Sequence, residues 1–346
     1  MTPRARVLVT AVSGDLGQAI VKALRIGQQG PIECHGCDAE PRGIGAAFTE
    51  TFHQVPVAGH PGYAARIAEL ASVLGVDAVI PASEAEIAAL SATAAVPALP
   101  SGVPVICQPA PWVRQFGDKL RCMEALRGRV PLAPFADGGD PASVARLVVE
   151  SGFPLVVKPR RSSGSRQIRV VAHQADLDRA LNATPAPIVQ QHLDGAAGEY
   201  SVGLFVCDLF ETAMAFRRTL GPAGCSWSAE TSEDAEVLQY ARAVASAAGL
   251  RGSANIQVRK GHAGVRLLEI NPRFSSLAAA RALCGFADVE WSLAVATGRR
   301  PAMPPAYRTL RFRRFIDEMI DIGGGFGVVA DWRPRALNQA GAFLGE

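Results

Sequence analysis

The stretch LLEINPRFSS, residues 267–276, is the most informative part of this chain of 346 residues. Its apolar residues indicate a buried strand, in which residues two apart point to the same face. Glu269 and Asn271 are therefore expected to project together, and their oxygen atoms suit Mg²⁺ with phosphate and water completing the shell. The alternative is an edge strand with solvated polar residues, but a buried glutamate without a partner would be costly. We predict a magnesium site here.

The residues around this stretch supply further candidates. The segment SANIQVRK, residues 253–260, predicts the facing strand of a hairpin and places Gln257 roughly opposite Glu269. Pro272 ends the strand pairing, and Arg273 then places a cation beside the expected metal. The sequence therefore predicts a metal site with an adjacent arginine.

A second stretch, FPLVVKPRRSSGSRQIRVV at residues 153–171, predicts two strands joined by a basic turn. Lys158 ends the first apolar strand, where its ammonium group can reach a phosphate as a point charge. The backbone N–H groups of residues 162–165 can close over phosphates. If the segment stood alone, an ordinary hairpin with a solvated basic tip would be the preferred interpretation.

A third stretch, IVQQHLDGAAGEYSV at residues 188–202, predicts an extended run followed by the acid Glu199. Such a run can present backbone groups to an adenine edge and a carboxylate to ribose hydroxyls. Together with GDKLRCMEAL at residues 117–126 and LLEINPRFSS, these pieces resemble the ATP-grasp superfamily in their order and spacing. The resemblance is closest to the branch with the carbamoyl-phosphate synthetase large subunit and the pyrrolysine-pathway ligase, and it covers about residues 117–298.

The resemblance implies a set of nucleotide contacts. The implied phosphate contacts are Lys119 and Lys158, and the implied flexible loop over the phosphates comprises Ser162, Ser163, Gly164, Ser165 and Arg166. The implied adenine hinge comprises Gln190, Gln191 and Leu193, and the implied ribose acid is Glu199. Family hinges often carry a glutamate at one of the two glutamine positions, so the chain departs from the family pattern there.

The resemblance also implies a metal centre and a reaction. Gln257, Glu269 and Asn271 match the Mg²⁺ ligands, with Glu269 bridging two ions, and Arg273 matches the residue that steadies the transferred γ-phosphate. The implied reaction is attack of a carboxylate on the γ-phosphate of ATP, followed by displacement of phosphate by an amine or ammonia. The implied cofactors are ATP and Mg²⁺, with Mn²⁺ as a substitute. A small-molecule carboxylate such as an amino acid and an amine are the implied substrates, and relatives commonly form homodimers.

The resemblance also points to two adjacent arginines. Arg217 and Arg218 belong to a strand that in relatives often faces the acceptor carboxylate, but neighbouring strand residues point oppositely, so only one can face the site.

Many relatives carry an aspartate where this chain has Gly203. Because no metal ligand is lost, we expect an active site rather than a vestigial one.

The N-terminal part alternates strand and helix signals as far as VPVICQP, residues 103–109, which predicts a parallel sheet covered by helices. The predicted fold is α/β, with a Rossmann-like pre-ATP-grasp domain followed by a two-lobed α+β ATP-grasp domain. The Rossmann-like domain is predicted at residues 1–110 and the N-terminal lobe with the phosphate loop at residues 111–190. The C-terminal lobe with the magnesium site is predicted at residues 191–300, followed by a C-terminal extension at residues 301–346.

Three other functions stay open on the sequence alone. An NAD(P)-dependent reductase is suggested by VLVTAVSGDLGQAI at residues 7–20 with Asp38 downstream, but a full G-x-G-x-x-G is missing and no tyrosine is followed by lysine four residues later. Carboxyphosphate or carbamoyl-phosphate chemistry is the alternative within the superfamily, although the chain is too short for the duplicated synthetase. A non-catalytic nucleotide-binding subunit is the third, against which the intact metal positions argue.

The composition excludes several partner classes. A net charge of +3 is too small for a nucleic-acid footprint, and no apolar stretch approaches the roughly 20 residues needed to cross a bilayer. Seven scattered cysteines, including Cys34 and Cys37 in a predicted buried strand, fit reduced thiols. We therefore expect a cytoplasmic protein that binds neither nucleic acid nor membranes.

Glu84 and Glu86 are expected at a helix N-terminus, with a modest substrate role as the second interpretation.

Overall fold

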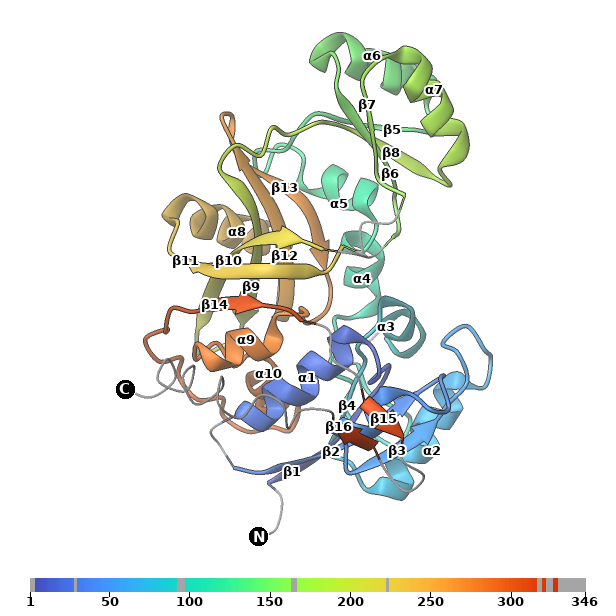
Figure 1. Ribbon diagram of the computed structural model, residues 1–346, viewed down its shortest axis with the longest axis vertical. Helices are drawn as coiled ribbons and strands as arrows, with labels where there is room; N and C mark the ends of the chain where they lie inside the picture. Colours follow the sequence, from blue (N-terminus) through green and yellow to red (C-terminus); the bar gives the residue numbers. More distant parts are fainter. Residues whose placement is uncertain are drawn as a thin grey trace. The chain divides into compact units, whose positions relative to one another are not determined.

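The computed structural model describes residues 4–27, 30–91, 97–162, 167–221, 224–315, 319–321 and 326–328 (Figure 1). Residues 1–313 form one compact unit and residues 314–346 a second. In the second unit, β15 (Met319–Asp321) pairs antiparallel with β16 (Phe326–Val328). A search of the described helices finds none with the length and apolarity to cross a membrane.

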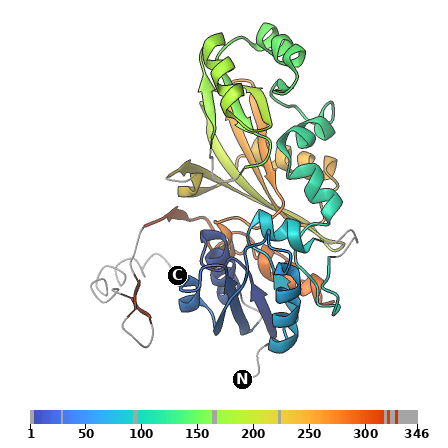
Figure 2. The same cartoon turned by 90° about the vertical axis from the view of Figure 1, so that its right-hand side faces the viewer.

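The N-terminal part of the first unit is a parallel sheet with strand order β3-β2-β1-β4. Its elements are β1 (Ala5–Val9), α1 (Asp15–Ile26), β2 (Ile32–Asp38), the 3-10 helix η1 (Ile44–Phe48), β3 (Thr51–Gln54), α2 (Tyr63–Leu74), β4 (Ala78–Ile80) and α3 (Glu84–Leu90). Because strand residues alternate, Val7 packs with α1 on one face and Leu8 with α2 on the other. Figure 2 shows helices on both sides of this sheet, which is drawn in blue. The predicted parallel sheet is confirmed.

The end of β1 differs from a dinucleotide-binding turn. The carboxylate of Asp38 accepts a hydrogen bond from the backbone N–H of Ser13 at 3.0 Å. The hydroxyl of Ser13 in turn accepts from the backbone N–H of Gly45, and a Cβ at Gly43 would lie 2.1 Å from that hydroxyl oxygen. The chain itself thus packs against the turn that a pyrophosphate would contact, and Asp38 is already engaged there.

The middle of the chain forms a four-stranded antiparallel sheet with order β5-β8-β6-β7. Its elements, with the two connecting helices that precede them, are α4 (Ala110–Phe116), α5 (Lys119–Leu126), β5 (Phe135–Asp137), α6 (Pro141–Ser151), β6 (Leu155–Pro159), β7 (Arg169–Val171), α7 (Gln174–Ala183) and β8 (Pro187–Gln191). Leu155 and Val157 pack under α6 and α7. The alternate residues Val156 and Lys158 face the other way, toward the pocket described below.

The remaining part is a six-stranded antiparallel sheet with order β13-β12-β9-β10-β11-β14. Its elements are β9 (Gly198–Val206), β10 (Glu211–Leu220), β11 (Ser226–Ser232), α8 (Ala235–Ala247), β12 (Gly252–Gly261), β13 (Gly264–Asn271), α9 (Ala278–Leu283), α10 (Asp288–Ala296) and β14 (Arg311–Arg313). On β9, Val202 and Leu204 pack against α8, and Phe205 packs with Trp291 of α10. The odd-numbered face of β9 therefore carries Glu199.

Two differences from the sequence-based expectation have physical reasons. Residues 103–109 form no full strand, and Val105 makes only an isolated parallel bridge with Val79, because Pro104 and Pro109 lack the amide donors that a ladder needs. In addition, α1 packs on α9 and α10, so Val289 and Leu293 share a core with the N-terminal sheet. The predicted boundaries between residues 1–110, 111–190 and 191–300 remain predictions.

Candidate functional site

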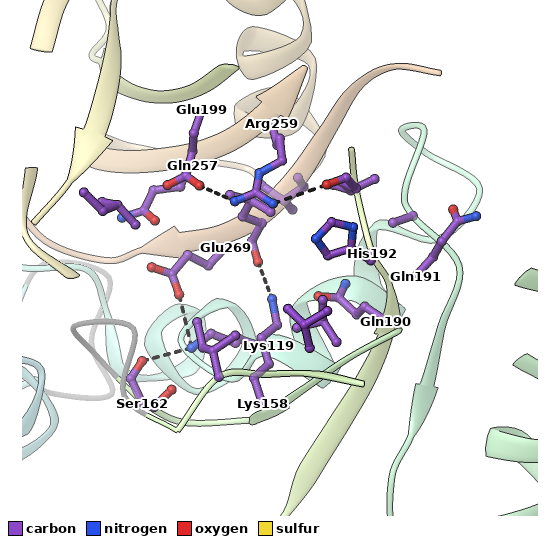
Figure 3. A pocket seen from close by; sticks show the side chains of 18 of the residues that line it. Lys119, Lys158, Ser162, Gln190, Gln191, His192, Glu199, Gln257, Arg259 and Glu269 are labelled. Carbon is purple, nitrogen blue, oxygen red and sulfur yellow. Dashed lines mark hydrogen bonds and ion pairs between the residues drawn. The ribbon is translucent and has the colours of Figure 1, made fainter. Parts of the chain in front are cut away.

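A pocket lies between the four-stranded and six-stranded sheets, and side chains from both line it (Figure 3). Val156 and Val170 give it apolar walls on one side, and Leu267 does so on the other. Its polar and charged lining residues are Lys119, Lys158, Ser162, Gln190, Gln191, His192, Glu199, Arg218, Gln257, Arg259 and Glu269. Two distant sequence stretches, residues 119–199 and 218–269, thus meet in one pocket.

Glu269 lies between two buried ammonium groups. Its Oε2 is 3.1 Å from Nζ of Lys119, and its Oε1 accepts from the side-chain amide of Asn271 at 3.2 Å. Burial alone would raise the pKa of Glu269, but the charges of Lys119 and Lys158 with these hydrogen bonds lower it to about 2. Burial, reinforced by repulsion from Lys119, lowers the pKa of Lys158 to about 8. The cluster therefore concentrates positive charge around one ionised carboxylate.

A β-bulge shapes the acidic strand beside this cluster. The pairing of β12 with β13 aligns Gln257 with Glu269, as the sequence predicts, and then shifts so that Val258 faces Leu267. Leu268 is the extra residue, and its backbone carbonyl accepts a hydrogen bond from Nζ of Lys158 at 3.3 Å. Bulges commonly occur beside functional sites because they redirect a side chain and free a backbone group. Here the bulge supplies the acceptor that orients Lys158.

Asp118 positions Lys119 at the first turn of α5. It is the N-cap residue, and its carboxylate accepts from the backbone N–H groups of Leu120 and Arg121. The guanidinium of Arg160 forms a two-pronged pair with the same carboxylate, both distances being 3.0 Å. Lys119 then donates to the carbonyl of Ser162 at 2.9 Å. One capped helix start thus ties Lys119 to the strand that carries Lys158.

Asp118→Asn is expected to lower the free energy of unfolding by about 1–2 kcal/mol near neutral pH, because it keeps a cap but loses the charge-assisted bonds to Arg160. Burial by itself would raise the pKa of Asp118, but hydrogen bonds from Arg160 and from the backbone of Arg121 lower it below 3.8. The stabilisation is therefore present above about pH 4 and is lost as the pH falls through the folded-state pKa. Urea unfolding of both proteins at about pH 7 and about pH 3 checks this; an equal gap at both values would contradict it.

Glu199 lies at the other end of the pocket, held by two arginines. Its Oε1 accepts from Arg218 at 2.8 Å and its Oε2 from Arg259 at 2.7 Å. Arg259 also donates to the backbone carbonyl of Leu193 at 3.3 Å, and its side chain packs against Gly195, whose φ is +61°. A Cβ at Gly195 would lie 3.0 Å from Cδ of Arg259. Arg259 thus joins the ribose-acid position to the hinge segment, a role that sequence analysis missed although Arg259 follows Gln257 by two strand positions.

A family model described as "ATP-grasp in the biosynthetic pathway with Ter operon" matches residues 183–316. The biotin carboxylase domain of 2-oxoglutarate carboxylase from Hydrogenobacter thermophilus is 16% identical with a TM-score of 0.68, covering 87% of this chain and 71% of that chain. N5-carboxyaminoimidazole ribonucleotide synthetase from Thermus thermophilus is 18% identical with a TM-score of 0.67, covering 88% and 82%. The chain has the ATP-grasp fold. The resemblance predicted from sequence is confirmed at that level.

A further ATP-grasp structure, N5-carboxyaminoimidazole synthetase from Staphylococcus aureus with ADP, is 14% identical with a TM-score of 0.69 and covers 89% of this chain and 80% of that chain. A search among curated protein sequences gives no match. The Hydrogenobacter protein was determined as a dimer with MgADP, ADP and bicarbonate. The fold is therefore assigned from structural similarity and from the family match over residues 183–316. The roles of site residues in this chain rest on its own geometry.

Arg217 and Arg218, adjacent residues of β10, have different surroundings. Arg218 lines the pocket, is nearly buried and donates to Oε1 of Gln257 at 2.7 Å. Arg217 is half exposed and lies 4.0 Å from Glu230 on the neighbouring strand. The alternation of side chains along β10 explains why only one of them reaches the pocket.

Arg273 does not line this pocket. Its Nε lies 3.3 Å from the carboxylate of Glu84, and its Nη1 donates to the carbonyl of Phe274. Glu84 begins α3, and Glu86 forms a capping box with Ser83, so the expected helix N-terminus is present. The catalytic role of Arg273 remains a prediction, and it requires Arg273 to leave Glu84.

The predicted hinge residues Gln190, Gln191 and Leu193 all line the pocket, as does Ser162. Gln190 is buried, and its Nε2 has no hydrogen-bond partner among the described residues. The predicted loop residues Ser163, Gly164, Ser165 and Arg166 lie outside the described residues. Asn271 is buried beside Glu269 without lining the pocket itself.

Gly203 has a steric explanation. A Cβ at this position would lie 2.7 Å from the guanidinium carbon of Arg281. Arg281 is fully buried and donates to the side-chain oxygens of Asn255 and Ser201 at 2.6 and 3.1 Å. The glycine thus makes room for a buried arginine. Arg281 thus contacts Asn255, which pairs across β12 and β13 with the predicted metal ligand Asn271.

Proposed function

We propose that this protein is an ATP-dependent ligase that joins a small-molecule carboxylate to an amine or ammonia, releasing ADP and phosphate. The observation that carries the proposal is the meeting of Lys119, Lys158 and Glu269 in one pocket between the two antiparallel sheets. Two ammonium groups around one ionised carboxylate suit the phosphates of a nucleotide and a divalent cation. Catalysis of phosphoryl transfer needs little more than such positioning and charge neutralisation.

The nucleotide is proposed to lie along the pocket from Gln190 to Glu269. The unpaired amide of Gln190 supplies a donor for a ring nitrogen of the base, and Glu199 supplies an acceptor for ribose hydroxyls. The cavity measures about 180 Å³, below the roughly 300–1,000 Å³ of small-molecule sites. Nucleotide entry therefore requires some of the side chains that line the pocket to move from their present positions.

The donor set also fits the Mg²⁺ that the fold implies, because Gln257, Glu269 and Asn271 offer one carboxylate and two amide oxygens on paired strands. When bound, the ion would neutralise phosphate oxygens, and Mn²⁺ is proposed to substitute for it. Lys119 would exchange its bond to Glu269 for a phosphate oxygen. Lys158 would hold another phosphate oxygen while Leu268 fixes its direction. Arg218 is proposed to meet an acceptor carboxylate.

A second candidate is carboxyphosphate chemistry, in which bicarbonate takes the place of the carboxylate. It is favoured by the Hydrogenobacter structure, which holds bicarbonate with MgADP on the same fold. The description of the matching family as part of a biosynthetic pathway supports a small-molecule acceptor in either case. A homodimer is proposed by analogy with that structure and is testable by light scattering.

The test is phosphate release from ATP with Mg²⁺ in a panel of amino acids, other small carboxylates, amines and bicarbonate. Stimulation by a carboxylate with an amine supports the ligase, and stimulation by bicarbonate alone supports the second candidate. No stimulation by any pair, together with tight binding of NAD(P)H, would overturn the proposal.

Arg259→Met is expected to raise the KM for ATP about tenfold with little change in kcat, because it removes binding shared by the ground and transition states. It should also reduce the preference for ATP over 2′-deoxy-ATP, since Glu199 loses a group that holds it toward the ribose. Arg242→Met, at an exposed ion pair with Glu211, is the matched control. An unchanged ATP to 2′-deoxy-ATP ratio in Arg259→Met would contradict the assigned role.

A further inference from the structure

A second cavity, of about 530 Å³, lies where the N-terminal part, α4 and one end of the six-stranded sheet meet. Its volume falls within the roughly 300–1,000 Å³ typical of small-molecule sites. None of the described residues lines both this cavity and the pocket around Glu269. It is therefore a separate place on the protein.

The walls of this second cavity are mostly apolar. Ile106 and Trp112 line one side, and Phe205, Phe274 and Val295 line others. Trp112 is fixed because its indole N–H donates to the carbonyl of Ala248 at 2.9 Å. Rigid aromatic and aliphatic walls of this kind bind apolar surface.

The charged groups at this cavity already have partners. Arg251 and Asp208 form an exposed ion pair at 2.5 Å, whereas the largely buried Arg273 pairs with Glu84 at 3.3 Å. A charged ligand in the buried part of the cavity would have to displace Glu84 from Arg273 or be buried without a counter-charge, which is costly. The cavity therefore selects for a neutral ligand.

Gln108 gives the cavity a directed polar group. Its Nε2 donates to the backbone carbonyls of Arg251 and Ser253 at 2.6 and 3.1 Å. Two carbonyls can only accept, so the orientation of the amide is fixed. The hydrogen bonds found for Gln108 use only its Nε2 and leave Oε1 as its free acceptor among the described residues, and Gln108 lines the cavity. A ligand N–H or O–H can satisfy that oxygen.

We propose that the second cavity binds a neutral small molecule, or the neutral part of one, with an apolar body and a hydrogen-bond donor directed at Gln108. Pro272, Arg273 and Phe274 form part of its wall and directly follow β13, which carries Glu269. A ligand bound in this cavity therefore contacts residues 272–274, which directly follow the strand that carries Glu269. The shared chemistry fits either an apolar part of the acceptor substrate or a separate effector.

The test uses the full chain and N-phenyl-1-naphthylamine, a neutral aromatic amine whose fluorescence rises in apolar surroundings. We expect saturable binding at one site, unchanged by saturating ATP. Ala296→Phe and Cys107→Phe each add bulk at a lining position and should weaken binding at least about tenfold. Ala64→Phe, at an exposed position on α2, is the matched control.

A variant is used only if its midpoint of thermal unfolding stays near that of the parent protein. If one cavity-filling variant fails to fold, the other supplies the test. Displacement of the probe by ATP, non-saturable binding, or full binding by a folded cavity-filling variant would overturn the proposal. These results do not depend on turnover, so they are independent of the ligase proposal. Once substrates are known, competition between the probe and one substrate identifies a substrate subsite, and a non-competitive change in rate identifies an effector site.

Discussion

Glu269→Gln is expected to lower the rate of ATP turnover at least about 1,000-fold while leaving the fold intact. Among the described residues that line the pocket, Glu269 and Glu199 are the carboxylates, and only Glu269 lies between Lys119 and Lys158. The amide keeps the size of the side chain but removes the charge that would hold a cation and both ammonium groups. Phosphate release at saturating ATP, Mg²⁺ and substrates measures the loss.

The matched control is Glu211→Gln, which alters a partly exposed glutamate of the same sheet that pairs with Arg242 at 3.2 Å. It should keep the parent rate. Binding of Mn²⁺, followed by electron paramagnetic resonance, gives a second readout that should weaken in Glu269→Gln alone. Full ATP turnover by a folded Glu269→Gln protein would show that the metal assignment is wrong.

The hairpin that carries the candidate metal ligands was predictable because its information is local. Strand alternation and a short glycine turn decide which side chains share a face, so Gln257 was expected opposite Glu269 and is found there. The bulge at Leu268 was not expected. It adds one residue to a strand without changing the apolar pattern, so alternation alone carries no sign of it.

Contacts between distant segments were less accessible to sequence analysis. Arg273 was expected beside the metal, but its partner Glu84 lies 189 positions away and belongs to the N-terminal part. Sequence analysis gave Arg259 no role, but in the structure it donates hydrogen bonds to Glu199 and to the backbone carbonyl of Leu193. Ion pairs across a fold depend on tertiary packing, for which a single sequence gives no spacing rule.

Gly203 illustrates how an apparent departure can be structural. Sequence analysis noted Gly203 as a departure from the family pattern that removes no metal ligand, and the structure shows that the space is needed by the guanidinium of Arg281. Arg281 is fully buried, and burial lowers its pKa to about 10. Its Nε and Nη1 have no hydrogen-bond partner among the described residues, while its Nη2 donates to Asn255 and Ser201 and its guanidinium lies 5.9 Å from the ring centroid of Phe286. The glycine is thus explained by a buried contact between distant segments, which no linear motif encodes.

Lys158→Met is expected to lower kcat/KM for ATP at least about 100-fold without a comparable loss of stability. Lys158 is buried, and burial lowers its pKa to about 8, which shows that its charge is held at a cost. Replacing a buried charge by an apolar side chain of similar length removes that cost. Lys260→Met is the contrast, because Lys260 pairs with Asp234 at 2.7 Å on the protein surface and should leave ATP turnover unchanged.

The pH dependence of unfolding separates Lys158 from other groups. Below about pH 8 the folded and unfolded chains both carry the Lys158 proton, and above about pH 10.4 neither does. Between these values the unfolded chain binds more protons, so the free energy of unfolding of the parent protein should rise with pH relative to Lys158→Met, by about 3 kcal/mol in total. Urea unfolding of the nucleotide-free proteins at several values in this window measures the difference. A constant difference across the window, or one that shrinks in the opposite sense, would show that Lys158 is not held as a destabilised ammonium group and would remove the electrostatic basis of its proposed role.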